Sequence, residues 1–366
     1  MTADEKSRVL IVDDAVENIQ MLMEALKDEH AILAAKDGEK ALRLAQAEAA
    51  PDIILLDIMM PGMNGYETCA RLKADKRTRD IPVLFITALT DEEDEAKGLA
   101  LGAVDYITKP FRPGLVKIRV RNQLELKKHR DHLDTLVRER TRELALTKEV
   151  TIESLATLAE CRDPETGGHI KRTQHYVRAL AQKVRTHPRF APFLNEEIIE
   201  LLYLSAPLHD VGKVGVPDAI LLKPGKLTPE EFEEMKKHTR YGSESLAKAE
   251  EKLGGSSFLS HARQIAHSHH ERWDGKGYPQ GLQGDEIPLG ARIMAIADVY
   301  DALISRRVYK PPFPHSKAVA IIIEGQGTQF DPDLCAAFLD MTEEFRTIAL
   351  RFADFDEERE CLSGED

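Results

Sequence analysis

The chain has 366 residues, 42% of them hydrophobic, which is enough for two or three domains with full hydrophobic cores. Its formal net charge of −13 argues against nucleic-acid polymers and anionic membranes as main partners, although local cations can still bind a small phosphorylated ligand. No apolar run approaches the roughly 18 residues of a membrane span and the cysteines form no close pair, so we expect a cytoplasmic protein with reduced thiols.

Residues 1–122 alternate short apolar runs with helical patterns. Near-continuous apolar runs of this length are typical of parallel strands that are buried on both faces. The pattern therefore predicts an α/β domain with a doubly wound, five-stranded parallel sheet. The predicted strands are RVLIVDD (8–14), AILAAK (31–36), DIILLD (52–57), PVLFIT (82–87) and AVDYIT (103–108).

Chemically informative side chains end several of these strands. Asp13 and Asp14 end the first strand, Asp57 the third, Thr87 the fourth and Lys109 the fifth. Carboxyl ends of parallel strands meet at one edge of a sheet, where clustered carboxylates need a cation between them, and hard oxygen ligands suit Mg²⁺. Asp57 could then attack a phosphoryl donor as a nucleophile. Alternatively, each acid only caps a strand, although this explanation is weak for all five positions together.

The motifs VDD, LLDIMMPGMNGYE, FITA and DYITKPF resemble those of the receiver domains of two-component response regulators, which have a flavodoxin-like fold. The resemblance implies that a sensor histidine kinase donates a phosphoryl group and that the Lys109–Pro110 bond is cis. The implied site residues are Asp57 as phosphoacceptor, Asp13, Asp14 and Asp57 as Mg²⁺ ligands, and Thr87, Tyr106 and Lys109 as switch or phosphoryl-contacting residues.

A charged helical segment follows over residues 123–150 and predicts a connector. It contains no glycine or proline, and Leu126 and Leu133 lie seven residues apart, as do Val137 and Leu144. This spacing is typical of a long helix or a short coiled coil. Two interpretations remain open: the helix pairs with a second copy, or it is a spacer or packs on its own catalytic domain. A homodimer could also form through the receiver.

Residues 151–340 have a helical pattern almost throughout and predict an all-α domain. A predicted helix over 169–184 begins with His169, and one over 195–210 ends with His209 and Asp210. A capped helix over 227–238 ends at His238. We expect a further helix over 263–273 to carry His269 and His270, and an apolar central helix over 289–305 to carry Asp298.

These five histidines and two carboxylates are more ligands than one ion needs, and facing helices can present them inward to a cluster of divalent metals. Adjacent residues on a helix diverge by about 100°, so His209 can ligate one ion while Asp210 bridges two. Such a pair of ions activates water and clamps a phosphodiester. Glu165 is a candidate ligand for a third ion, and Lys213 could neutralise the phosphate under attack. The remaining histidines of this region, His175, His187, His261, His267 and His315, fit structural roles better.

The segments HDVGKVGVPDAILLKPGKLTPEEFEEMKKH and HHERWDGKGYPQGLQGDEIPLGARI resemble the HD-GYP branch of the HD-domain phosphohydrolases. The resemblance implies hydrolysis of cyclic di-GMP to pGpG or GMP at a centre of two or three Fe, Mn, Ni or Zn ions. The implied metal ligands are Glu165, His169, His209, Asp210, His238, His269, His270 and Asp298. The implied catalytic residues are His209, Asp210 and Lys213, and the implied substrate-binding residues are Lys213, Tyr278, Arg307 and Lys310.

Other functions fit the same residues. The domain could hydrolyse a linear dinucleotide such as pGpG or another cyclic nucleotide, or it could bind cyclic di-GMP as a sensor or scaffold with little turnover. Over residues 341–366 the sequence predicts one last helix followed by a frayed acidic tail.

Overall fold

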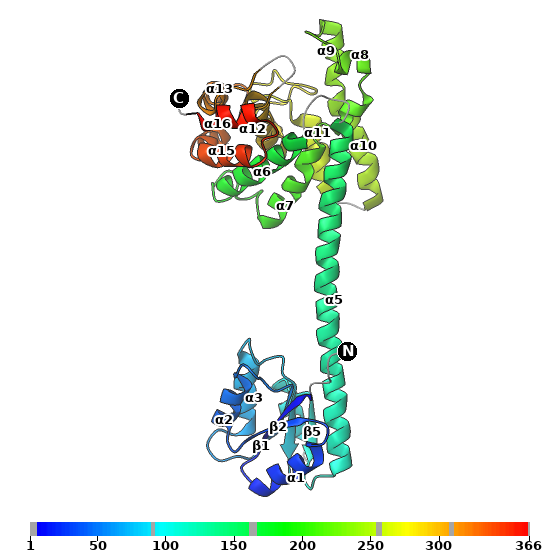
Figure 1. The fold of residues 1–366 in the computed structure, drawn as a ribbon, viewed down its shortest axis with the longest axis vertical. Coiled ribbons are helices and arrows are strands. Elements are labelled where there is room, and N and C mark those ends of the chain that lie inside the picture. The colour runs from blue at the N-terminus through cyan, green and yellow to red at the C-terminus, as the bar shows by residue number, and fades with distance from the viewer. Residues whose placement is uncertain (1–5, 89–91, 161–166, 254–257, 307–310, 365–366) are drawn as a thin grey trace. The chain divides into compact units, whose positions relative to one another are not determined.

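The computed structural model describes residues 6–88, 92–160, 167–253, 258–306 and 311–364. The chain divides into two compact units, Met1–Arg142 and Glu143–Asp366. Figure 1 shows the sheet of the first unit and the helices of the second, with the long helix α5 contributing residues to each.

The first unit contains a five-stranded sheet whose strands are all parallel, in the order β2-β1-β3-β4-β5. The sheet confirms the predicted doubly wound α/β fold, because the strand order reverses at β1, between β2 and β3. The strands are β1 (Arg8–Val12), β2 (Ala31–Ala35), β3 (Ile53–Asp57), β4 (Val83–Thr87) and β5 (Asp105–Thr108).

Alternate residues of the central strands enter two separate hydrophobic clusters, one on each face of the sheet, as the period of two along a strand requires. Leu10, Ile54 and Phe85 belong to one cluster, and Val9 and Ile53 belong to the other. The helices that follow the first four strands are α1 (Val16–Leu26), α2 (Gly38–Ala45), α3 (Gly65–Ala74) and α4 (Glu92–Ala100).

Two local features position α3 beside the end of β3. The Asn64 side chain caps the helix by accepting a hydrogen bond from the backbone N–H of Glu67 at 2.9 Å. A Cβ atom on Gly65 would lie only 2.2 Å from the backbone oxygen of Asp57, so this close approach requires glycine. Close packing of the backbone at Gly65 therefore helps to set the position of Asp57.

Helix α5 (Pro113–Glu160) is 48 residues long and extends beyond the predicted connector at both ends. Val116 and Val120 near its start are buried in a cluster of the first unit, and Ile152 near its end is buried in a cluster of the second. Residues 131–147 between them are exposed all around the helix. Packing within each unit therefore stabilises the two ends of α5.

The described residues of the second unit form helices and turns around a central helix, α12 (Leu289–Ile304), and the only sheet among the described residues is that of the first unit. This arrangement agrees with the predicted all-α domain. Met294 and Tyr300 of α12 are fully buried. The other helices are α6 (Gly167–Val184), α7 (Glu196–Ser205), α8 (Asp218–Leu221), α9 (Pro229–Lys236), α10 (His238–Leu253), α11 (Phe258–Ser268), α13 (His315–Glu324), α14 (Pro332–Leu339), α15 (Thr342–Arg351) and α16 (Asp356–Ser363).

Two local predictions are wrong. Helix α11 ends at Ser268, so His269 and His270 lie in the turn that follows the helix. The acidic tail is not frayed, because residues 356–363 form α16, in which Leu362 is buried in the core. Three acidic residues in its first turn suit the positive end of the helix dipole.

Candidate phosphoacceptor site and metal centre

Asp13, Asp14 and Asp57 meet at the carboxyl edge of the sheet, where each offers an oxygen within 4.8 Å of the others. Asp13 and Asp57 are buried, whereas Asp14 is exposed. The Nζ atom of Lys109 lies 3.0 Å from Asp13 Oδ2 and 3.0 Å from Asp57 Oδ2. The structure therefore brings together the four charged residues that the sequence predicted for this site.

The electrostatics of this edge favour a bound cation. Burial raises the pKa of the Asp57 carboxyl above its usual value, and the Asp13 charge adds to the rise, while the hydrogen bond from Lys109 opposes it. Burial alone would lower the pKa of Lys109, but hydrogen bonds to Asp13 and Asp57 raise it overall. Lys109 is therefore charged at neutral pH and partly compensates the two buried acids.

The predicted switch residues lie on the neighbouring strands. Thr87 is buried at the end of β4, and Tyr106 lies on β5 with the Arg119 guanidinium carbon 5.5 Å from its ring centroid. The Lys109–Pro110 peptide bond is cis, as the sequence predicted.

In the second unit, the predicted ligands form two neighbouring groups in which each residue offers an atom within 4.8 Å of the others. The first group is Asp210, His238, His269 and His270, and the second is His169, His209 and Asp298. Every predicted metal ligand among the described residues belongs to one of these groups, whereas none of the five histidines assigned structural roles does.

Asp210 lies between the two groups. Its Oδ1 atom is 3.3 Å from His238 Nε2 and 3.5 Å from His269 Nε2. Its Oδ2 atom is 3.4 Å from His209 Nε2, on the side of the second group. One carboxylate thus faces each group with a different oxygen, which is the arrangement that a bridging ligand needs.

The histidines have a common orientation that suits metal binding. The Nδ1 atoms of His209, His238 and His269 lie 2.9, 2.8 and 3.0 Å from backbone carbonyl oxygens, which can only accept a hydrogen bond. Each Nδ1 must therefore carry the proton, so the Nε2 lone pair is directed at the cluster when the ring is neutral. His238 begins α10, His269 follows the end of α11, and His209 follows the turn Ala206–Leu208 after α7.

Several buried atoms of the cluster are left without a hydrogen-bond partner. Among the described residues, such atoms include Asp210 Oδ1, His238 Nε2 and His269 Nε2. In the second group, the Nε2 atoms of His169 and His209 face one another at 3.5 Å. Unpartnered buried atoms and facing lone pairs are costly unless a cation lies between them, so the residues fit divalent metal ions.

The pKa shifts of His238, His270 and Asp210 also favour metal binding. Burial lowers the pKa of His238 to about 4 and lowers that of His270 well below its usual value, so both rings are neutral at pH 7. Burial would raise the pKa of Asp210, but Lys213 and His209 hold it well below its usual range. His238 and His270 are therefore neutral and Asp210 is ionised, which are the forms that bind metal, whereas the Asp210 and Asp298 carboxylates raise the pKa of His209 against the effect of its burial.

Asp301 contacts the Nδ1 atom of His169, whereas the Nε2 atom of that ring faces His209. The pairing of Asp301 with Arg172 was not predicted from the sequence. Asp301 Oδ2 lies 2.8 Å from His169 Nδ1, and the Arg172 guanidinium donates to both Asp301 oxygens, at 2.6 and 3.0 Å. Arg172 is three residues after His169 on α6, and Asp301 is three residues after Asp298 on α12. Residues three apart on a helix lie on the same face, so this equal spacing is the sequence signal that could have indicated the contact.

We expect Arg172→Met to destabilise the protein by about 3–5 kcal/mol, because it leaves the buried Asp301 charge without its cation. Chemical denaturation monitored by circular dichroism measures this loss. Arg185→Met is a matched control, since Arg185 pairs with Glu196 at the surface and should cost less than about 1 kcal/mol. Equal stabilities of the two variants would contradict the supporting role of Arg172.

Glu271 anchors the loop that follows the double histidine, a role that was not predicted from the sequence. Its buried carboxylate accepts hydrogen bonds from the backbone N–H groups of Gln280, Gly281 and Leu282, at 2.7, 3.2 and 3.1 Å. The loop brings the Tyr278 ring to 4.8 Å from the ring of His270, centroid to centroid. Burial raises the pKa of the Tyr278 hydroxyl, so it stays protonated.

Gly277 allows this loop to approach the double histidine closely. A Cβ atom at Gly277 would lie 2.5 Å from the Cα atom of Glu271 and 2.6 Å from the backbone oxygen of His270. A larger residue would therefore displace the neighbouring Tyr278 from the cluster.

Lys213, the remaining described residue of the predicted site, has its Nζ atom 2.8 Å from Asp210 Oδ2. It therefore lies beside the cluster with a charge opposite to that of a phosphate. The predicted residues Glu165, Arg307 and Lys310 lie outside the described residues.

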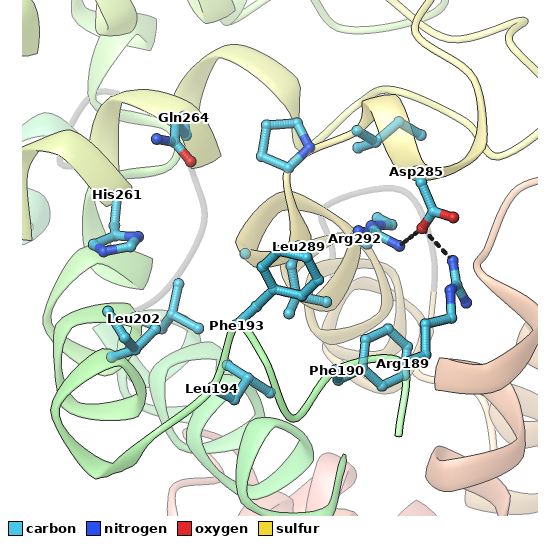
Figure 2. Close-up of a pocket in the computed structure, with 14 residues that line it drawn as sticks. Arg189, Phe190, Phe193, Leu194, Leu202, His261, Gln264, Asp285, Leu289 and Arg292 are labelled. Atoms are coloured by element: carbon cyan, nitrogen blue, oxygen red, sulfur yellow. Dashed lines mark hydrogen bonds and ion pairs between the residues drawn. The ribbon is translucent and has the colours of Figure 1, made fainter. Parts of the chain in front are cut away.

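A separate cavity of about 560 Å³ contains none of the predicted site residues. Figure 2 shows its apolar wall, which includes Phe190, Phe193 and Leu194, and the ion pairs of Asp285 with Arg189 and Arg292 at its edge. The arginine charges are already compensated there, so this cavity provides no phosphate site.

Comparison with known protein families agrees with both units. The response regulator receiver domain model matches residues 9–121, and the HD domain model matches residues 153–334. Together with the two sites, these matches define the class of the protein: a receiver-containing response regulator with an HD-type, metal-dependent phosphohydrolase domain. No helix within the described residues has the length and apolarity needed to traverse a lipid bilayer.

Several curated relatives align with most of the chain. The chain is 48% identical over 355 residues to a probable cyclic di-GMP phosphodiesterase of Vibrio cholerae, with 94% of this chain and 80% of the relative covered. It is 36% identical to the cyclic di-GMP phosphodiesterase response regulator RpfG of Xanthomonas campestris, with 96% and 92% covered. A 3'3'-cGAMP-specific phosphodiesterase 2 of Vibrio cholerae is 35% identical, with 87% and 57% covered. The chain belongs to the family of response regulators that join a receiver to an HD domain.

Proposed function

We propose that this response regulator is a cyclic di-GMP phosphodiesterase that yields pGpG, GMP or both, controlled by phosphorylation of Asp57. The observation that carries the proposal is Asp210, whose two oxygens face two separate groups of histidines in a buried cluster. Relatives that align over most of the chain are named for the same activity.

In this proposal, the seven clustered residues hold two divalent ions, which supply an activated water and neutralise phosphate charge when bound. Asp210, whose two oxygens face the two groups, would be shared between them, and Asp298 lies in the group with His169 and His209. Fe, Mn, Ni and Zn all suit imidazole-rich, carboxylate-bridged sites. A third ion would need a further ligand, for which Glu165 is the candidate.

In this proposal, two residues beside the cluster contact the substrate. The Lys213 ammonium lies next to Asp210, where it can neutralise the non-bridging oxygens of the scissile phosphate as charge develops. The ring of Tyr278, close to His270, offers an aromatic face to a guanine base. We propose Arg307 and Lys310 as further phosphate contacts.

A second substrate class deserves a direct test. A relative named for 3'3'-cGAMP aligns with 87% of this chain, so a mixed cyclic dinucleotide is an alternative, as is linear pGpG. The cluster binds the phosphodiester, which these ligands share, so the choice among them depends on contacts to the bases. A metal-loaded sensor with little turnover is the alternative outside enzymes.

The experiment is a hydrolysis assay on anaerobically purified full-length protein loaded separately with Fe²⁺, Mn²⁺, Ni²⁺ or Zn²⁺. Cyclic di-GMP, 3'3'-cGAMP and pGpG are supplied separately and products are resolved by chromatography. We expect cyclic di-GMP to be consumed with the highest kcat/KM and to give pGpG or GMP. Bound metal and bound cyclic di-GMP without turnover by any metal form would favour the sensor.

For the receiver, we propose that a sensor histidine kinase phosphorylates Asp57 with Mg²⁺ held by Asp13, Asp14 and Asp57. Lys109, within 3.0 Å of Asp13 and Asp57, would contact the phosphoryl oxygens, and Thr87 and Tyr106 would respond. The cytoplasmic location expected from the sequence stays a prediction.

A further inference from the structure

A second aromatic side chain and a cation lie beside Tyr278, and both belong to helix α9. Phe232 and Lys236 are four residues apart on this helix, so they share one of its faces. The Phe232 and Tyr278 rings meet edge to face, with centroids 6.2 Å apart. The Lys236 Nζ atom lies 4.9 Å from the Phe232 centroid and 5.4 Å from the Tyr278 centroid. These three side chains therefore form one contiguous group.

This group borders the candidate metal cluster. The Tyr278 ring lies 4.8 Å from that of His270, centroid to centroid. Helix α9 ends at Lys236, two residues before His238. In a nucleotide the base is joined to its phosphate through a single sugar, so a phosphodiester held at the cluster places one of its bases within reach of the group.

The local structure of α9 keeps the two side chains accessible. The helix begins with a capping box, in which Thr228 accepts a hydrogen bond from the Glu231 N–H at 3.3 Å and Glu231 accepts one from the Thr228 N–H at 2.7 Å. Phe232 is nevertheless 45% exposed. Lys236 pairs with the exposed Glu233 at 2.6 Å, but an ammonium has three donors and an exposed pair is weak, so Lys236 keeps donors for a ligand.

We propose that Lys236 determines base specificity, selecting guanine over adenine at the position beside Tyr278. The inference rests on the proposed function, in which a cyclic dinucleotide places its phosphodiester at the metal cluster. Guanine presents two acceptors, O6 and N7, side by side, whereas adenine replaces O6 with an amino donor. An ammonium only donates, so Lys236 attracts the guanine edge and not the adenine edge. The rings of Phe232 and Tyr278 pack against any base and add affinity without this choice.

One lysine of this kind recognises one base, which orders the cyclic dinucleotides. Cyclic di-GMP presents a guanine to Lys236 in either orientation, 3'3'-cGAMP presents one in only one of its two orientations, and cyclic di-AMP presents none. We therefore expect cyclic di-GMP and 3'3'-cGAMP to bind within a small factor of one another, and cyclic di-AMP to bind at least about tenfold more weakly.

Calorimetric titration of metal-loaded, full-length protein tests this role, with hydrolysis-resistant phosphorothioate analogues of cyclic di-GMP and cyclic di-AMP as ligands. Lys236→Met keeps an apolar stem over the two rings and removes the ammonium. We expect its Kd for the cyclic di-GMP analogue to rise about tenfold while that for the cyclic di-AMP analogue stays nearly unchanged, so that the preference for guanine is lost. Lys237→Met is the matched control, because it removes the same charge from the next residue, whose ammonium pairs with Glu234. It should keep the wild-type preference.

A preference for guanine that survives in Lys236→Met, or that is lost equally in the two lysine variants, would overturn the proposal. A wild type that binds neither analogue, or binds both equally, would overturn it as well. Failure of the proposed function is a separate result: wild type that binds the cyclic di-GMP analogue but hydrolyses no cyclic di-GMP would contradict the phosphodiesterase activity, and the binding preference would still establish the role of Lys236.

Discussion

Asp210→Ala should lower kcat/KM for cyclic di-GMP by at least about a thousandfold and reduce bound metal in the same variant. The side chain is buried, and its two oxygens face His238 and His269 on one side and His209 on the other. Removing it takes a negatively charged ligand from both groups at once. Activity and metal content, the latter by plasma mass spectrometry, are measured on the same preparation.

Two further variants separate this loss from misfolding. Asp210→Asn keeps the shape of the side chain while removing its charge, so it should fold with a normal circular dichroism spectrum and still lose metal. Asp340→Ala removes a surface carboxylate whose partner is Lys183 and should keep both metal and activity. Full metal content and activity in either Asp210 variant would contradict the bridging role.

Asp57→Ala should abolish labelling by acetyl phosphate while leaving basal hydrolysis of cyclic di-GMP measurable. Asp57 is buried at the end of β3 beside Asp13 and Lys109, and the proposed hydrolytic residues all belong to the second unit. The labelling reaction contains Mg²⁺, and its product is measured by gel electrophoresis in which phosphorylated proteins migrate more slowly.

The control for this variant is Asp28→Asn, at an exposed position after α1, which should be labelled as wild type is. Surviving phosphorylation of the Asp57 variant would mean that another residue accepts the phosphoryl group. Loss of basal hydrolysis in a folded Asp57 variant would mean that the receiver is required for turnover.

The parts of the sites that sequence predicted correctly depend on local chemistry. Buried parallel strands need near-continuous apolar runs, so the ends of β1, β3 and β5 could be located, and Asp13, Asp57 and Lys109 with them. In the second unit, the unusual density of histidine beside carboxylate singled out seven residues that the structure brings together in two neighbouring groups. His269 and His270 were placed correctly in the cluster although the predicted helix around them is wrong.

The interactions that sequence missed form only when segments fold against one another. Arg172 and Asp301 are 129 positions apart, and neither segment indicates the other residue as its partner. Glu271 reads as a surface acid until the loop folds back and presents three N–H groups to it. The acidic residues of α16 suggested a frayed end. The sequence of this segment alone does not show that Leu362 is buried, because that burial depends on the other helices.

The sequence by itself determined the two fold classes, the strand ends and the candidate metal ligands, because hydrophobic periodicity and ligand chemistry are properties of neighbouring residues. Tertiary structure alone decided that Asp210 lies between two groups of candidate ligands, that Arg172 balances Asp301, and that Glu271 accepts three backbone hydrogen bonds from the loop after it. Those features depend on which helix faces meet. That choice results from the packing of the whole core and is not encoded in any single segment.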